Sequence, residues 1–505
     1  MNTHSRTRSL ITNSLFSILS WLMPIVIGFI ATPLIVKSLG NRDYGLYAVI
    51  LGFVSYSFTF GIGKILTKYI AEYRGSGQSE KIDEIVSATF WLSLFIALSG
   101  TLIVAVTAKY IVTDILYLPE DQREIGVIGL YLACAAIIAT MLSQIFQNIL
   151  QGLNRFGSYL MLTNVSGVLL NIGNVTLALM GYGITVLLMW NFLALCMMAI
   201  AFGYDAIRHL PEFSIKPRFR GEAWRPVLRY GTNIVLYQVF GNVLLAFERG
   251  WIVRKFGPET ATFYIVPMML AIYMHGIVAS SLMVLFPTVN ELLNDTERLI
   301  SLYQKATKLM LAIICLLSTL LIYGGRPLLA VWIDQEMANR GYPVLVIHVL
   351  TFGTIASMMM IWQVAEGFRA PIFNTLATFI WSVVAIPLMI YAADDWNIEG
   401  VAFSRFVGVV VTLPLIFIVE MRYFGRVNWK FWGAIASRLM AASILVGAVL
   451  LTYFRYCPPK FGYIVPGFGL GATLFLISLR LTGFFTVDEL RMIRDLLMKN
   501  RKTAV

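Results

Sequence analysis

The chain has 505 residues, of which 58% are hydrophobic and 13% are charged, and its mean hydropathy is +0.76. A water-soluble globule needs many more polar groups to cover its surface, so this composition excludes a soluble fold. The formal net charge is +12, and where the basic residues lie decides whether it indicates nucleic acid or a membrane surface.

Apolar runs of about twenty or more residues recur along the chain, and a helix of about twenty residues crosses the hydrocarbon core of a bilayer. Hydropathy therefore predicts an all-α polytopic membrane protein with about fourteen transmembrane helices. The first run is too long for a signal peptide and has no small-residue cleavage pattern, so we expect it to be retained. The predicted spans cover residues 10–36, 44–70, 85–108, 125–150, 158–180, 184–204, 228–253, 260–286, 306–323, 343–365, 371–392, 400–419, 431–453 and 462–481.

The basic residues alternate between the two sides of the membrane. About twenty-five Lys and Arg lie on the side of the N-terminus and about ten on the other side, an asymmetry that predicts a cytoplasmic N-terminus. Because the number of spans is even, the C-terminus is also predicted to be cytoplasmic. The basic segments on this side suit anionic lipid headgroups, so we expect no nucleic-acid partner.

An internal repeat relates the two halves of the chain. Most of its residue pairs are 217 positions apart, and one is 215 apart. Two six-helix units in the same orientation would be related by an axis along the membrane normal, with the substrate site between them. The pairs are Val36 with Val253, Lys37 with Arg254, Gly40 with Gly257, Tyr47 with Tyr264, and Gly152 with Gly367.

These features predict five regions. The predicted regions are an N-terminal six-helix bundle at 1–205, a basic cytoplasmic linker at 206–226, a C-terminal six-helix bundle at 227–424, two additional transmembrane helices at 425–485 and a basic cytoplasmic tail at 486–505.

No enzyme signature is complete. The string from Gly61 to Lys64 is similar to a phosphate-binding loop, but Phe58 replaces the first glycine and Ile65 replaces the Ser or Thr. No cysteines or histidines have metal-ligand spacing, and no loop reaches the roughly 50 residues of a small soluble domain. We therefore expect no enzymatic activity, no metal and no cofactor, with a proton or a sodium ion as the candidate coupling ion.

Ionisable residues inside apolar runs are the candidates for function, because a charge at mid-membrane costs about 2.5–3.5 kcal/mol on insertion scales. Such a charge persists with a partner or beside a watery cavity. Position along the spans places two of these groups in the cytoplasmic half and three in the periplasmic half, with one more lysine at the cytoplasmic rim. The candidate substrate-binding cations of a lumen are Lys64, Arg249, Arg405 and Lys68, and the candidate coupling or charge partners are Glu248 and His275.

Each candidate also has a structural interpretation. The two lysines could snorkel to the interface, and the two arginines could form a salt bridge at the outer rim. The candidate histidine could be a packing residue, although its unperturbed pKa of about 6.5 would suit proton coupling. We expect Glu248 to pair with Arg249 or Arg405 when the cavity is empty, and His348 to lie at the membrane interface.

The segment from Pro33 to Tyr47 is the most specific stretch of the chain, and it closely resembles the start of Wzx-type polysaccharide flippases. These proteins belong to the multidrug/oligosaccharidyl-lipid/polysaccharide superfamily, whose members have two six-helix bundles, often with two added helices, and work by alternating access. The resemblance covers nearly the whole chain. It is carried by Ser38, Leu39, Gly40, Asp43, Tyr44, Gly45, Leu46, Gly61, Tyr69, Ala71, Glu72, the loop Gln151, Gly152, Leu153 and the connector at 213–231.

The resemblance implies a flippase that moves an undecaprenyl-pyrophosphate-linked oligosaccharide from the cytoplasmic to the periplasmic or outer leaflet of a bacterial or archaeal cytoplasmic membrane. Its expected partners are this glycolipid, membrane lipids, a polysaccharide polymerase and a chain-length regulator. Cationic lumen residues are typical of the family but have no fixed positions, so the candidate site rests on depth alone. The alternatives are a cation-coupled multidrug exporter or a peptidoglycan-precursor flippase of the same fold, a membrane enzyme of polysaccharide assembly, and a non-transporting scaffold.

Overall fold

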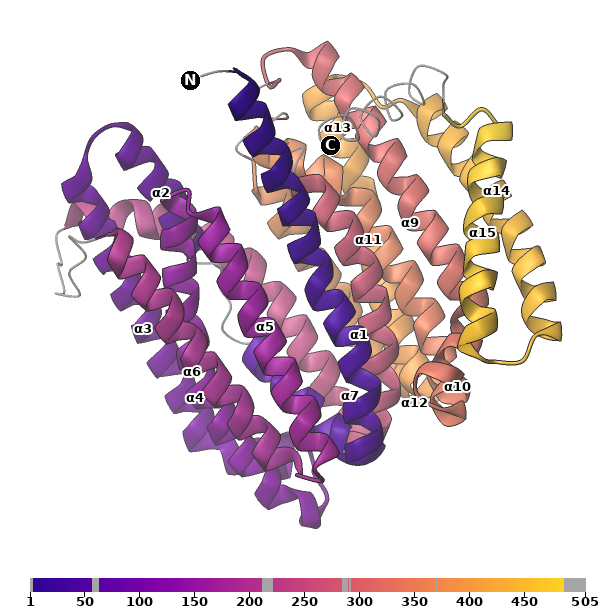
Figure 1. Cartoon of the computed structure of the whole chain (residues 1–505), viewed down its shortest axis with the longest axis horizontal. Coiled ribbons are helices and arrows are strands. Elements are labelled where there is room, and N and C mark those ends of the chain that lie inside the picture. Colours follow the sequence, from indigo (N-terminus) through magenta and orange to yellow (C-terminus); the bar gives the residue numbers. More distant parts are fainter. Residues whose placement is uncertain are drawn as a thin grey trace.

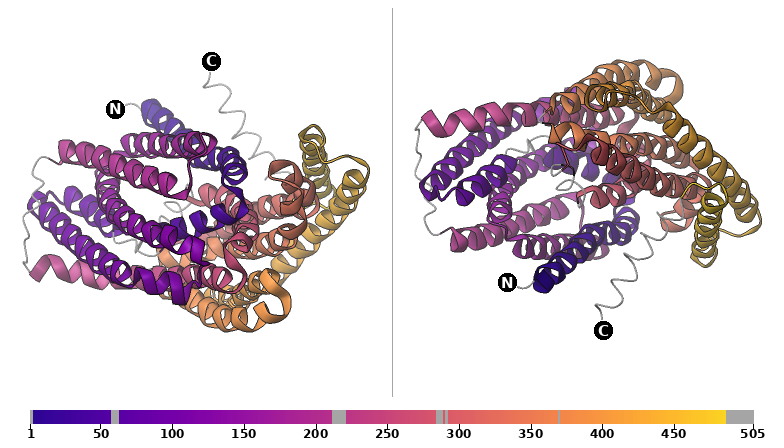
Figure 2. Two further views of the ribbon diagram at one scale, coloured as in Figure 1. Left: turned by 90° about the horizontal axis from the view of Figure 1, so that it is seen from below. Right: turned by 90° about the horizontal axis from the view of Figure 1, so that it is seen from above.

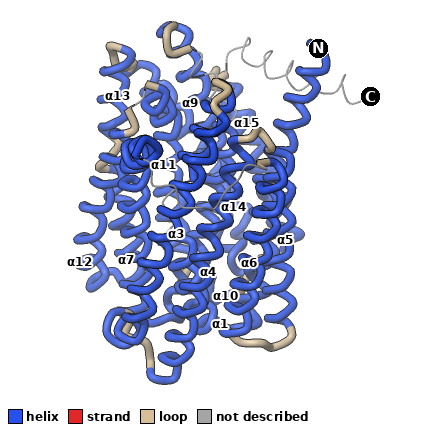
Figure 3. Tube along the Cα trace, turned by 90° about the vertical axis from the view of Figure 1, so that its left-hand side faces the viewer, coloured by secondary structure: helices blue, strands red, loops and turns tan. Residues whose placement is uncertain are grey.

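The computed structural model describes residues 3–56, 63–210, 221–283, 289, 292–368 and 370–485, and the regular structure within these ranges is helical throughout, with no strand (Figure 3). The elements are α1 (Thr3–Tyr56), α2 (Gly63–Gly75), α3 (Ser79–Tyr110), the π-helical turn η1 (Ile111–Ile115), α4 (Glu120–Gly152), α5 (Phe156–Leu179), α6 (Ile184–His209), α7 (Gly221–Met283), α9 (Thr296–Trp332), α10 (Gln335–Arg340), α11 (Tyr342–Gly367), α12 (Ile372–Val410), α13 (Pro414–Phe424), α14 (Trp429–Tyr456) and α15 (Phe461–Leu481).

Three of the long helices contain a break. Gly40 in α1 has φ 78° and ψ 162°, and Gly257 in α7 has φ 83° and ψ 167°. Glycine adopts this positive φ without the steric cost that a Cβ would bring, so the two paired glycines turn the chain in the same way. Helix α12 is broken at Trp396 and Asn397. Each break falls at or next to a loop that the sequence predicts between two spans.

Eleven helical segments of the described chain are long and apolar enough to cross a membrane, and three of these segments contain the breaks. The all-α, multi-span architecture predicted from hydropathy is therefore confirmed. Most helix ends lie within a few residues of the predicted span ends, but α9 begins at Thr296, ten residues before its predicted span. Its first turns are polar and are capped by the Asp295 carboxylate, which accepts from the Arg298 amide at 3.1 Å, and hydropathy does not register such turns.

The segment predicted as a cytoplasmic linker is partly helical. Helix α6 continues to His209 and α7 begins at Gly221. Residues 211–220 of that segment, together with the predicted tail at 486–505, lie outside the described residues.

The helices form two groups that meet along α1 and α7 (Figures 1 and 2). We call α1–α6 the N-terminal group and α7–α15 the C-terminal group. Within the second, α14 and α15 pack on each other and on α9, where Leu320 lies in one apolar cluster with Phe475. Helices α10 and α2 lie at opposite ends of the molecule in Figure 1, and we call the first of these the α10 end.

Candidate functional site around helix α7

An ion pair between Glu248 of α7 and Arg405 of α12 lies inside the C-terminal group, and the two side chains are 0% and 4% exposed. The guanidinium carbon also lies 5.0 Å from the ring centroid of Trp381 and 5.5 Å from that of Phe352. The indole N–H of Trp381 donates to the Arg405 carbonyl at 3.0 Å, which ties the ring to the helix that carries the arginine. The opposite charge and the aromatic faces together offset the cost of burying each charge.

Two further buried side chains complete this cluster. The hydroxyl of Tyr264 donates to the other carboxylate oxygen of Glu248, and Tyr264 is fully buried. His348 stands edge-to-face against the Tyr264 ring with the centroids 4.7 Å apart. Neither ring nitrogen of His348 has a hydrogen-bond partner among the described residues.

The depth of His348 at the membrane interface stays a prediction, but its side chain does not face the surface of the protein. Its side chain is 0% exposed because it sits more than one turn inside α11 and faces α7 rather than the surface. The sequence shows only its distance from the span start, and one turn of helix contains both buried and exposed positions.

Arg249 follows Glu248 directly but contacts a different neighbour, since one step along a helix rotates the side chain by about 100°. Its Nη1 donates to the Ala48 carbonyl of α1 at 3.1 Å, and the residue is 8% exposed. It packs on Gly52, where a Cβ would lie 2.2 Å from Nη1. Of the two partners predicted for Glu248, the structure thus pairs it with Arg405, while Arg249 reaches across to the N-terminal group.

His275 lies on α7 at a distance from the Glu248 cluster. It is 18 residues beyond Gly257 and so about 27 Å along the helix from that break. It lines a cavity of about 220 Å³ between α7, α11 and α12, together with Trp381, Glu366 and Asn374. The Asn374 amide donates to the Glu366 carboxylate at 2.7 Å, whereas the Nε2 atom of His275 has no partner among the described residues. A titrating role for His275 stays a prediction.

The two candidate lysines lie on α2, away from the arginines. Lys68 is exposed, and its Nζ atom lies 5.0 Å from the ring centroid of Tyr69. The side chain of Lys64 lies outside the described residues. Helix α2 packs mainly on α3 and α4, so the structure does not place Lys68 on one surface with the buried Arg249 and Arg405. A common cationic lumen therefore stays a prediction.

Sequence reasoning missed Tyr264, His348 and Trp381 as members of the buried cluster. Depth within an apolar run singles out charged residues, and uncharged hydrogen-bonding side chains give no such signal. The pairing of Tyr264 with Tyr47 in the internal repeat is the sign of its importance that the sequence contains. No group of three or more His, Cys, Asp or Glu residues that could hold a metal occurs in the described parts of the chain.

The fold of the chain is similar to that of solved membrane transporters, including members of the multidrug/oligosaccharidyl-lipid/polysaccharide (MOP) superfamily. The lipid II flippase MurJ in an inward closed conformation is similar over 96% of this chain and 99% of its own, with a TM-score of 0.68 and 14% identity. An outward-facing multidrug resistance transporter of the MATE family is similar over 82% of this chain and 96% of its own, with a TM-score of 0.64 and 13% identity.

A sequence model of the family described as "Polysaccharide biosynthesis protein" matches residues 10–293, which is more than half of the chain. The chain belongs to this family. A Shigella flexneri protein named "Putative O-antigen transporter" is 19% identical over 413 residues, which cover 81% of this chain and 97% of that protein. The resemblance noted from the segment around Gly40 is thereby confirmed.

Proposed function

We propose that the chain is a flippase that moves an undecaprenyl-pyrophosphate-linked oligosaccharide from the cytoplasmic to the outer leaflet of a bacterial or archaeal inner membrane, for O-antigen or exopolysaccharide synthesis. The observation that carries this proposal is a buried arginine, Arg249, held where the two helical groups of a polysaccharide-family transporter meet. A guanidinium is always charged and forms bidentate contacts with phosphate oxygens. It therefore suits the headgroup of this glycolipid.

The proposed cycle is alternating access between the two groups. A hydrated sugar loses many hydrogen bonds in hydrocarbon, each worth several kcal/mol, and a polar lumen between the groups would replace them. In the structure Arg249 is bonded to the α1 backbone. Separation of α1 from α7 at the α10 end would release its guanidinium toward the diphosphate, while the lipid tail stays in the bilayer.

The finer features of the proposal follow from the sequence. They are fourteen spans, pseudo-two-fold related bundles, both termini in the cytoplasm, no enzymatic activity, and a polymerase and chain-length regulator as partners. A proton or sodium ion is the candidate driving ion. Glu248 and His275 are its candidate sites, because both are ionisable and lie inside the C-terminal group.

Translocation of a fluorescent undecaprenyl-pyrophosphate oligosaccharide in proteoliposomes tests the proposal. Losing the Arg249 guanidinium removes charge-assisted hydrogen bonds of about 1.5–3 kcal/mol, so Arg249→Ala should slow translocation by about ten- to a hundredfold. Arg455→Ala removes an exposed arginine from α14 and should leave the rate unchanged.

Imposed proton and sodium gradients, applied to the native chain, would identify the driving ion. A native chain that flips none of several glycolipids but exports cationic dyes would replace the proposal with the multidrug-exporter alternative. A folded Arg249→Ala variant with native flipping would remove Arg249 from the mechanism.

A further inference from the structure

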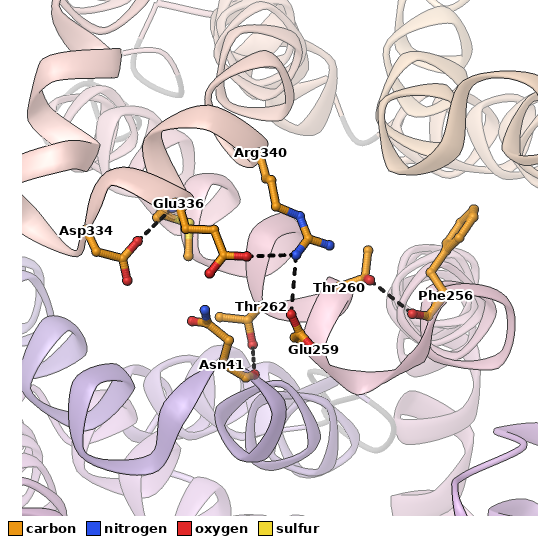
Figure 4. A network of polar contacts seen from close by, with 9 residues as sticks. Asn41, Phe256, Glu259, Thr260, Thr262, Asp334, Glu336 and Arg340 are labelled. Atoms are coloured by element: carbon orange, nitrogen blue, oxygen red, sulfur yellow. Dashed lines mark hydrogen bonds and ion pairs between the residues drawn. The ribbon is translucent and has the colours of Figure 1, made fainter.

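At the α10 end of the molecule, α1 and α7 are in direct contact (Figure 4). The hydroxyl of Thr262 on α7 donates to the Asn41 carbonyl of α1 at 2.5 Å. In the opposite direction, Gly45 of α1 lies against the Pro258 carbonyl of α7, and a Cβ at Gly45 would be 1.8 Å from that oxygen. Each helix therefore touches the backbone of the other.

The internal repeat of the sequence relates these two contacts to each other. Gly45 and Thr262 each stand five residues after a helix break, and Asn41 and Pro258 each follow the break directly. Both pairs have the 217-residue spacing that relates Gly40 to Gly257. One copy of the contact is a threonine hydroxyl on a carbonyl, and the other is a bare glycine against a carbonyl.

The glycine copy tolerates no side chain. A carbon atom 1.8 Å from a backbone oxygen is an impossible contact, and a helix carbonyl cannot rotate away as a flexible side chain can. Relief requires α1 and α7 to move apart at this point. A side chain at position 45 would thus increase the distance between the two groups.

The ion pairs described at the α10 end connect residues within the same helical group. Arg340 pairs with Glu259 and Glu336 within the C-terminal group, as Figure 4 shows, and Arg42 pairs with Asp121 within the N-terminal group. The contacts between the two groups at this end, which we call the Gly45–Thr262 seam, go mainly to main-chain oxygens, although the Tyr44 hydroxyl donates to the Met269 sulfur at 3.7 Å. Besides Thr262, they include Arg254 to Asp114 and Ile115, and Trp332 to Phe29 at 2.7 Å.

We propose that the Gly45–Thr262 seam sets the equilibrium between the closed and open states of the α10 end, with the side-chain volume at position 45 as its controlling variable. This inference rests on the alternating access proposed above. At Thr262, Arg254 and Trp332 the acceptors across this seam are main-chain oxygens and not carboxylates, so the seam can open there without separating an ion pair.

Spin labels measure the seam directly. Cysteines at Glu124 on α4 and Gln335 on α10, both exposed, report the distance between the groups in a background without the four native cysteines. The unmodified seam should give a short distance. Gly45→Ala should add a longer population and Gly45→Val a larger one. Gly167→Val is the matched control, since a Cβ there meets nothing within 4 Å, and it should leave the distance unchanged.

Thr262→Val keeps the side-chain volume but removes the hydroxyl donor. Losing one hydrogen bond should raise the open-to-closed ratio by about two- to tenfold. Adding Thr262→Ala to Gly45→Ala should not restore closure, because the Pro258 carbonyl clash remains. If Gly45→Ala does not fold, Thr262→Val still tests the seam.

Native distances in a folded Gly45→Ala or in Thr262→Val would overturn the inference. The measurement uses no glycolipid, so the seam can fail while flipping is confirmed. Likewise, flipping can fail for every glycolipid tested while the labels still report the opening of the seam.

Discussion

Tyr47 and Tyr264 occupy corresponding positions in the two helical groups, yet their hydroxyls meet different chemistry. Asn191 donates to the Tyr47 hydroxyl at 3.0 Å and is also bonded to Asn174 at 3.1 Å, so the N-terminal cluster is made of neutral groups. Tyr264 instead donates to the carboxylate of Glu248. The tyrosine at this repeat position thus bonds to a network of amides in one group and to an ion pair in the other.

The two clusters differ in whether their side chains can gain or lose a proton. Amide and phenol groups of the N-terminal cluster keep their charge state over the physiological pH range, so this cluster can hold helices together but cannot exchange a proton. The C-terminal cluster contains a carboxylate, a guanidinium and a buried imidazole. Of these two clusters, only the C-terminal one contains ionisable groups that could serve the proposed ion coupling.

The largest expected effect on stability comes from removing one partner of the Glu248–Arg405 ion pair. Glu248→Leu leaves the buried guanidinium of Arg405 without its carboxylate, which should lower the free energy of unfolding by about 3–5 kcal/mol. Thermal unfolding in detergent with the native lipid retained measures the loss.

The matched control removes both charges. Glu248→Leu combined with Arg405→Leu should recover most of the loss, because a well-packed apolar pair often replaces a buried ion pair at little cost. Equal stability of the single and double variants would show that the charges do not depend on each other.

The helices were predictable because the thickness of the membrane fixes the length of an apolar run. The predicted span 462–481 and α15, Phe461–Leu481, nearly coincide. The turn at Gly40 was also visible, since a glycine followed by a polar loop ends the first apolar run. Where a helix continues beyond the bilayer, as α9 does from Thr296, hydropathy stops too early.

The site was predictable in part. Depth alone selected Glu248 and Arg405, because a buried charge needs a partner and few charges are available. Depth did not decide between Arg405 and Arg249 as that partner, since the choice depends on which face of α7 meets α12. Contacts such as that of Gly45 with the Pro258 carbonyl depend on the packing of two distant segments, which one sequence does not reveal.

A smaller effect is expected from the tyrosine of the charged cluster. Tyr264→Phe removes a hydrogen bond to an ionised carboxylate while keeping the ring against His348. Hydrogen bonds to charged groups contribute about 1.5–3 kcal/mol, so the unfolding free energy should fall by that amount. A loss below about 0.5 kcal/mol, measured by the same thermal unfolding, would mean that Glu248 does not depend on this hydroxyl.

The smallest effect is expected at the corresponding tyrosine of the N-terminal group. Tyr47→Phe deletes an acceptor for the neutral amide of Asn191, which keeps its bonds to Asn174 and to the Leu187 carbonyl at 2.7 Å. A neutral hydrogen bond contributes about 0.5–1.5 kcal/mol, so Tyr47→Phe should cost less than Tyr264→Phe. Both substitutions remove one oxygen from a buried ring, so the difference in unfolding free energy isolates the charge of the partner. Equal losses at the two positions would show that the ion pair does not strengthen its hydrogen bond, and the division of roles between the groups would then lose its energetic basis.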